Sequence, residues 1–135
     1  MMGFMDEALW GVLEQKAREE EEGLRPGQRV ADAYLSGVRS VCEFGIDRAK
    51  TIRDHFPMYT LHDETHICNV LRGMAELLGD SAGQLSRDEA AMLVLAACCH
   101  DIGMSYSEAE KDGLLGDRDR LAEYLERNHG EYVKA

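Results

Sequence analysis

Two short stretches of the sequence contain residue types that can bind a metal ion. The first is His62-Asp63-Glu64-Thr65-His66, in which histidines four residues apart fall on one face of a helix. The second is the doublet His100-Asp101, which directly follows ten consecutive apolar residues, 90–99. A neutral imidazole is the commonest protein metal ligand, and carboxylates bind the same divalent ions. The two stretches therefore predict a metal site if the fold brings them together.

The apolar run makes an isolated aspartate at position 101 costly. A helix that is apolar all round is expected to be buried on every side, and ten residues are too few to span a membrane. Asp101 would then lie in the last turn of a buried helix, where the negative end of the helix dipole repels it. An arginine such as Arg53 or Arg72 could neutralise it, as could a metal ion shared with His100. The shared ion explains both residues of the doublet, and we favour it.

The first stretch differs from the H-E-x-x-H signature of metalloproteases. In that signature a glutamate directly follows the first histidine and polarises the attacking water. Here the shorter Asp63 holds that position, and Glu64 points about 100° further round the helix. What remains is a helix that offers His66, with His62 one turn earlier. A histidine beside an apolar stripe is usually a half-buried, hydrogen-bonded residue, but the second His-Asp pair makes His66 a candidate third ligand.

The periodic segments of the chain all have the helical period, which predicts an all-α fold. We expect helices over about residues 6–20, 30–54, 60 or 63 to 78, 86–99 and 117–128. Pro57 would end the second helix and Gly79 the third, while Ser86-x-x-Glu89 is a capping box that would open the fourth. The polar, glycine-containing stretch before the fifth is expected to be a loop.

Composition limits the classes of function. The chain has 135 residues, of which 44% are hydrophobic, enough for one packed domain. Its 26 acidic and 15 basic residues give a net charge of −11, which argues against a nucleic-acid groove. A phosphorylated small molecule remains possible, because a bound cation can supply positive charge. With no membrane-length apolar segment, no signal peptide and four cysteines without CxxC spacing, we expect a cytoplasmic protein that does not associate with membranes.

These residues resemble the HD superfamily of metal-dependent phosphohydrolases. Its pattern is a histidine on one helix, a His-Asp doublet that ends another, and a final aspartate on a later helix. The matching stretches are THICNVLRGMAELL, from Thr65, and EAAMLVLAACCHDIGMS, from Glu89. FPMYTLHDETHI, from Phe56, is similar to the HD-CE branch, which is often joined to a GHKL-type ATPase. The resemblance implies an HD-domain-like helical bundle that hydrolyses a phosphate ester or nucleotide.

The resemblance also implies roles for individual residues. His66, His100 and Asp101 would be ligands of a divalent metal (Mn, Mg, Fe, Zn or Ni), and Asp101 could bridge two ions. His62 matches an upstream histidine that contacts phosphate or supports a ligand.

Two further residues lie near the end of the chain. His129 matches a downstream histidine of some two-metal branches, although a cap at a helix end, before Gly130, explains it equally well. Arg127 is a predicted phosphate contact, although exposed helical arginines are usually only solvated.

The sequence departs from the HD pattern in two places. Met104 follows the doublet's glycine where a branch that cleaves cyclic dinucleotides has lysine, so that substrate is not supported. The final aspartate has no clear counterpart, since Asp112, Asp117 and Asp119 are expected in or near the polar loop. Either the chain is the N-terminal part of a larger helical domain, which we favour, or the site is incomplete.

We therefore expect an N-terminal helical segment, residues 1–55, that packs on an HD-type metal-binding core, residues 56–135, which we expect to be truncated at its C-terminus. The predicted function is metal-dependent phosphohydrolysis. The alternative is a non-catalytic regulatory or scaffolding module of a longer protein, with a GHKL-type ATPase domain as its partner in the same polypeptide.

Overall fold

A computed structural model of the chain describes residues 3–52, 63–104 and 108–127. All regular structure in these segments is helical, which confirms the all-α prediction. The structure divides into two compact units, Met1–Ser105 and Tyr106–Ala135. The first unit contains α1 (Ala8–Glu22), α2 (Ala31–Lys50), α4 (Glu64–Leu78) and α5 (Arg87–Cys99), and the second contains α6 (Glu108–Arg127). The boundary predicted from the sequence, between an N-terminal segment, 1–55, and a metal-binding core, 56–135, remains a prediction. None of the described helices is both long enough and apolar enough to cross a membrane.

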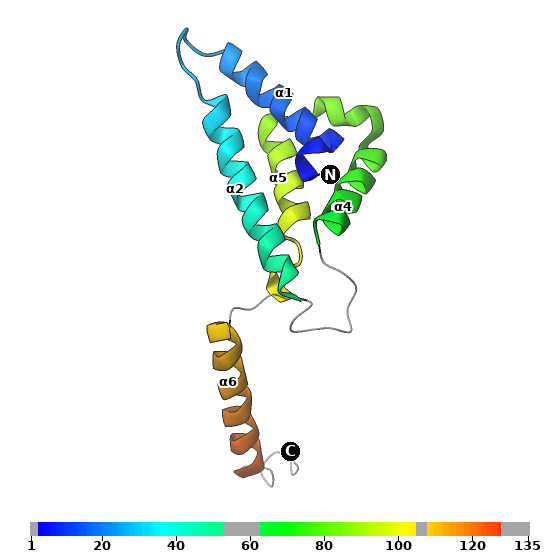
Figure 1. The fold of residues 1–135 in the computed structure, drawn as a ribbon. Coiled ribbons are helices and arrows are strands. Elements are labelled where there is room, and N and C mark those ends of the chain that lie inside the picture. Colours follow the sequence, from blue (N-terminus) through cyan, green and yellow to red (C-terminus); the bar gives the residue numbers. More distant parts are fainter. Residues whose placement is uncertain (1–2, 53–62, 105–107, 128–135) are drawn as a thin grey trace, which may run out of the picture. The chain divides into compact units, whose positions relative to one another are not determined.

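Helix α5 lies at the centre of the first unit, where it contacts α1, α2 and α4 (Figure 1). Its buried face meets fully buried side chains of α1 and α4 in one apolar core. The large, fully buried side chains of these three helices include Leu9 and Leu13 of α1, Leu71 of α4 and Val94 of α5. Because α4 and α5 share this core, the two helices that bear the predicted metal ligands are held in one body.

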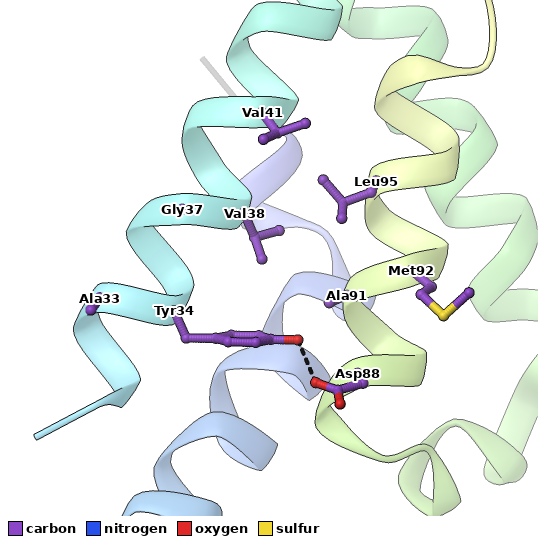
Figure 2. A pocket seen from close by; sticks show the side chains of 9 residues that line it. All are labelled: Ala33, Tyr34, Gly37, Val38, Val41, Asp88, Ala91, Met92 and Leu95. Carbon is purple, nitrogen blue, oxygen red and sulfur yellow. Dashed lines mark hydrogen bonds between the residues drawn. The ribbon is translucent and has the colours of Figure 1, made fainter. Parts of the chain in front are cut away.

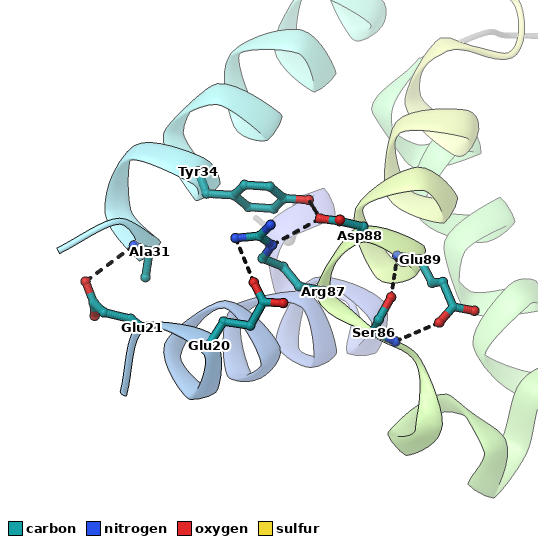
Figure 3. Close-up of polar contacts among 8 residues, drawn as sticks. All are labelled: Glu20, Glu21, Ala31, Tyr34, Ser86, Arg87, Asp88 and Glu89. Atoms are coloured by element: carbon teal, nitrogen blue, oxygen red, sulfur yellow. Dashed lines mark hydrogen bonds and ion pairs between the residues drawn. The ribbon is translucent and has the colours of Figure 1, made fainter. Parts of the chain in front are cut away.

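Local signals set the ends of α4 and α5. The Asp63 carboxylate accepts a hydrogen bond from the His66 amide at 3.0 Å and so caps α4, and Gly79, with φ of 52°, ends it. The Ser86 hydroxyl and the Glu89 carboxylate form the predicted capping box at the start of α5 (Figure 3). Figure 3 also shows the polar network beside it, in which the Tyr34 hydroxyl donates to Asp88 at 2.7 Å.

The expectation that the apolar helix is buried on every side is wrong. Met92 of α5 is 69% exposed, and α5 forms with α2 a shallow apolar groove of about 520 Å³ (Figure 2). Gly37 and Val41 line the groove on α2, and Leu95 lines it beside Met92. In the described part of the chain, neighbouring helices cover only part of the circumference of α5.

The second correction concerns the start of α6. This helix begins at Glu108, nine residues before the predicted start at 117, so the stretch expected to be a loop is helical. The strong helix formers Glu, Ala, Lys and Leu in this stretch outweigh Gly113 and Gly116, each of which costs about 1 kcal/mol relative to alanine.

Candidate metal centre

His66 lies in the first turn of α4, which two contacts hold in place. The Asp63 cap binds the amide of His66 itself, and the Glu64 carboxylate accepts a hydrogen bond from the Phe4 amide at 3.2 Å. Phe4 belongs to a short 3-10 turn, η1 (Phe4–Asp6), and is buried against Trp10. The N-terminus of the chain thus supports the turn that presents the His66 imidazole.

His100 is the C-terminal capping residue of α5, and Asp101 follows it before another 3-10 turn, η3 (Ile102–Met104). The His100 Nδ1 lies 2.7 Å from the carbonyl oxygen of Ala97. A carbonyl only accepts hydrogen bonds, so Nδ1 donates this bond, and Nε2, on the other side of the ring, is the nitrogen that can bind a metal. Metal-binding histidines are commonly oriented by such a bond to a backbone carbonyl.

The three predicted ligand atoms form a small triangle. His66 Nε2 lies 3.4 Å from His100 Nε2 and 3.7 Å from Asp101 Oδ2, and the last two atoms are 2.8 Å apart. A circle through these points has a radius of about 1.9 Å, and metal–nitrogen and metal–oxygen bonds are about 2.0–2.2 Å long. One ion can therefore reach all three atoms from just outside their plane. Among the described residues, this is the one group of three or more histidine, cysteine or acidic side chains that could hold a metal ion.

Arg72, which the sequence offered as a cation for Asp101, pairs with a different carboxylate. Arg72 Nη2 lies 2.9 Å from the Glu7 carboxylate, and Nη1 donates to Asn69. The other arginine considered, Arg53, lies outside the described residues. The Asp101 side chain is 19% exposed and its charge faces the two imidazoles, as the shared-ion interpretation requires.

The cysteine beside the doublet does not extend the ligand set. All four cysteines are free. Burial raises the pKa of the Cys99 thiol, and contact with Cys42 followed by burial raises the pKa of Cys98. A thiol binds a metal as the thiolate, which these environments disfavour. The cysteines next to His100 are therefore core residues, as their place in the apolar run suggested.

The roles of the remaining predicted site residues stay predictions. His62 and His129 lie outside the described residues. Arg127 is exposed at the end of α6, 3.9 Å from Glu123, in the second unit.

The candidates for the final aspartate also lie on α6. Asp112, Asp117 and Asp119 are all exposed, and Asp117 pairs with Arg120. Contrary to the sequence-based expectation, they lie within a helix and not in a loop, because α6 starts earlier than predicted.

Comparison with known proteins agrees with the geometry. Residues 56–135 match the HD-CE family, and this range contains all three members of the triangle. The chain belongs to the HD-CE family. No curated protein and no solved structure matches it. HD-CE membership accounts for an HD-type domain and agrees with the predicted divalent metal, and it leaves the ligand and catalytic roles of individual residues as predictions.

Sequence reasoning missed the groups that orient the ligands. The Ala97 carbonyl and the Phe4 amide are backbone atoms, and no residue type marks them. Gly45, which lies against the last turn of α5, gave only one weak signal, an isolated glycine within a helical pattern.

Proposed function

We propose that this HD-CE protein is a metal-dependent phosphohydrolase that acts on a phosphate ester or nucleotide. The triangle of His66, His100 and Asp101 is the observation that carries the proposal. Two imidazoles and one carboxylate on one side of an ion leave its other positions open for water and substrate. Family membership supports the same assignment.

The chain's own residues would prepare the site before any substrate arrives. The bond from His100 Nδ1 to the Ala97 carbonyl holds the imidazole in the tautomer that ligates through Nε2. Asp101 supplies the one negative charge of the triangle, which partly neutralises a divalent ion. The His66 and His100 side chains are 39% and 38% exposed, so a substrate can reach the open side.

A divalent ion bound there would lower the pKa of a water molecule towards neutrality and polarise a phosphoryl oxygen. His62 and Arg127 remain the predicted phosphate contacts, because a cationic or hydrogen-bonding group is needed to hold the transferring phosphoryl group.

One observation favours a second candidate, a regulatory module without catalysis, for which the predicted partner is a GHKL-type ATPase domain. The described residues supply three ligands, and the aspartates considered as a fourth are exposed on α6. A site with three ligands can hold a structural or sensory ion without turning over a substrate.

Metal analysis combined with phosphatase assays tests the proposal. The chain, loaded with Mn²⁺, Fe²⁺, Zn²⁺ or Ni²⁺, should retain one or two ions and release phosphate from part of a panel of nucleotides and phosphate esters. His100→Ala and Asp101→Ala should lose both properties, whereas Asp80→Ala, at an exposed aspartate, should retain them. Retained metal without phosphate release supports the regulatory module, and a wild-type chain that binds no metal refutes the phosphohydrolase.

A further inference from the structure

Helix α2 approaches the last turn of α5 more closely than any side chain would allow. A Cβ atom built on Gly45 would lie 2.5 Å from the carbonyl oxygen of Cys98 and 2.8 Å from Cys99 Sγ. It would also lie 3.1 Å from the Cys98 carbonyl carbon. The Cys98 atoms belong to the backbone, so they cannot rotate away as the end of a long side chain would. Only glycine fits at this position.

The turn that Gly45 touches is the one that orients the candidate metal ligands. Cys98 and Cys99 immediately precede His100 and Asp101, and the Ala97 carbonyl that fixes the His100 ring belongs to the same turn. Helix α2 also contacts η3, which follows the doublet. The doublet is thus supported by α2 through the segments on both of its sides.

Gly37 shows that this close approach is specific to one glycine of α2. It lies about two turns before Gly45, and a Cβ atom built on it would meet nothing within 4 Å. Gly37 lines the open groove between α2 and α5 (Figure 2). The two glycines share a helix and a partner helix, and they differ in whether backbone fills the space beside them.

We propose that Gly45 is a positioning residue for the metal site: its lack of a side chain lets α2 rest against the Cys98 carbonyl and so fixes the turn that carries His100 and Asp101. The part of this inference that concerns metal affinity rests on the proposed function. An added methyl group needs about 3.4 Å or more from the carbonyl oxygen in place of 2.5 Å, so the turn must move by about 1 Å. Metal ligands tolerate errors of only about 0.2 Å in their distances.

The test compares Gly45→Ala with Gly37→Ala in the complete chain. Long-range ¹H–¹⁵N correlation spectra of the metal-free chains, all recorded at one pH, report the ¹⁵N shift of His100 Nδ1, which changes when its hydrogen bond to the Ala97 carbonyl is altered. Zn²⁺ affinity is measured separately by competition with a chelating dye. The first measurement needs no metal, so it remains informative if the proposed function is wrong.

The wild-type chain and Gly37→Ala should show the same His100 Nδ1 shift and should bind Zn²⁺ equally well. Gly45→Ala should show a changed His100 Nδ1 shift and a Zn²⁺ affinity about 10–100-fold lower, with an unchanged helical circular dichroism spectrum. If the wild-type chain binds none of the metals tested but Gly45→Ala still alters the His100 Nδ1 shift, the phosphohydrolase is refuted and the positioning role stands.

Two results would overturn the inference. One is a Gly45→Ala variant that keeps both the wild-type His100 Nδ1 shift and the Zn²⁺ affinity, and the other is an equal change in both glycine variants. If Gly45→Ala does not fold, the double variant Gly45→Ala/Cys99→Ala is measured in its place, with trimethylamine N-oxide in all samples to favour the folded state. It removes the contact with Cys99 Sγ and keeps the contact with the Cys98 carbonyl, so the same criteria apply.

Discussion

The ion pair between Glu7 and Arg72 links the start of α1 to α4, and its two partners should differ in what their removal costs. Glu7 Oε1 and Arg72 Nη2 are 2.9 Å apart. The Glu7 side chain is 7% exposed, whereas that of Arg72 is 53% exposed. Arg72→Leu leaves a buried carboxylate without its cation, while Glu7→Gln leaves a guanidinium group that can rotate towards the solvent.

The two costs can be estimated from these exposures. Opposite charges about 4 Å apart attract by about 4 kcal/mol at an effective dielectric constant of 20. Solvent at the exposed guanidinium reduces this value, and the positive end of α1, which begins directly after Glu7, offsets up to about 1 kcal/mol of the loss. We therefore expect Arg72→Leu to lower the free energy of unfolding by about 2 kcal/mol and Glu7→Gln by about 1 kcal/mol.

Urea unfolding followed by circular dichroism at 222 nm measures both values, with equal slopes required for a valid comparison. Arg18→Leu is the control, because it breaks a pair of similar length, 2.7 Å to Asp32, whose side chains are 44% and 77% exposed. It should change stability by no more than the error of the measurement. If Glu7→Gln costs as much as Arg72→Leu or more, burial of the carboxylate does not govern the strength of this contact, and the reasoning fails.

Three further substitutions test the packing, a cap and a charge. Leu71→Ala, at a fully buried position of α4, should cost about 2–5 kcal/mol in urea unfolding, whereas Leu77→Ala on the same helix, 90% exposed, should cost less than about 0.5 kcal/mol. Ser86→Ala removes the cap of α5 and should cost about 1 kcal/mol, and Ser86→Asp, which can also cap, should restore most of it. The hydrogen bond from the Tyr34 hydroxyl, and secondly that from Arg87, lowers the pKa of Asp88 below its ordinary value of 3.8. The ionised Asp88 carboxylate therefore stabilises the fold above pH 3.8. This contribution is lost as the pH falls through the lowered pKa of the folded state. Tyr34→Phe should therefore lose less stability than the wild type between pH 5 and pH 3 in thermal melts, and an equal loss would show that the bond to Asp88 does not act in the folded state.

Local signals in the sequence were sufficient to predict most of the helices. The Ser86-x-x-Glu89 box opens α5 and Gly79 ends α4, because caps and turns depend on residues that are neighbours in the chain. The prediction failed at the start of α6, where glycines that suggested a loop are tolerated within a helix. It also failed for the face of α5 that bears Met92, since the sequence of a helix does not show which neighbours cover it.

The sequence by itself identified His66, His100 and Asp101 as candidate ligands, because an acid after an apolar run requires a cation and histidine can share one. The tertiary structure alone decided that His66 and His100, 34 positions apart, bring their Nε2 atoms to 3.4 Å. It alone also showed that Arg72 forms an ion pair with Glu7, and that backbone atoms of α5 fill the space beside Gly45. Residue types record which chemistry is possible, whereas distances between helices arise from the packing of a shared core, which no single segment encodes.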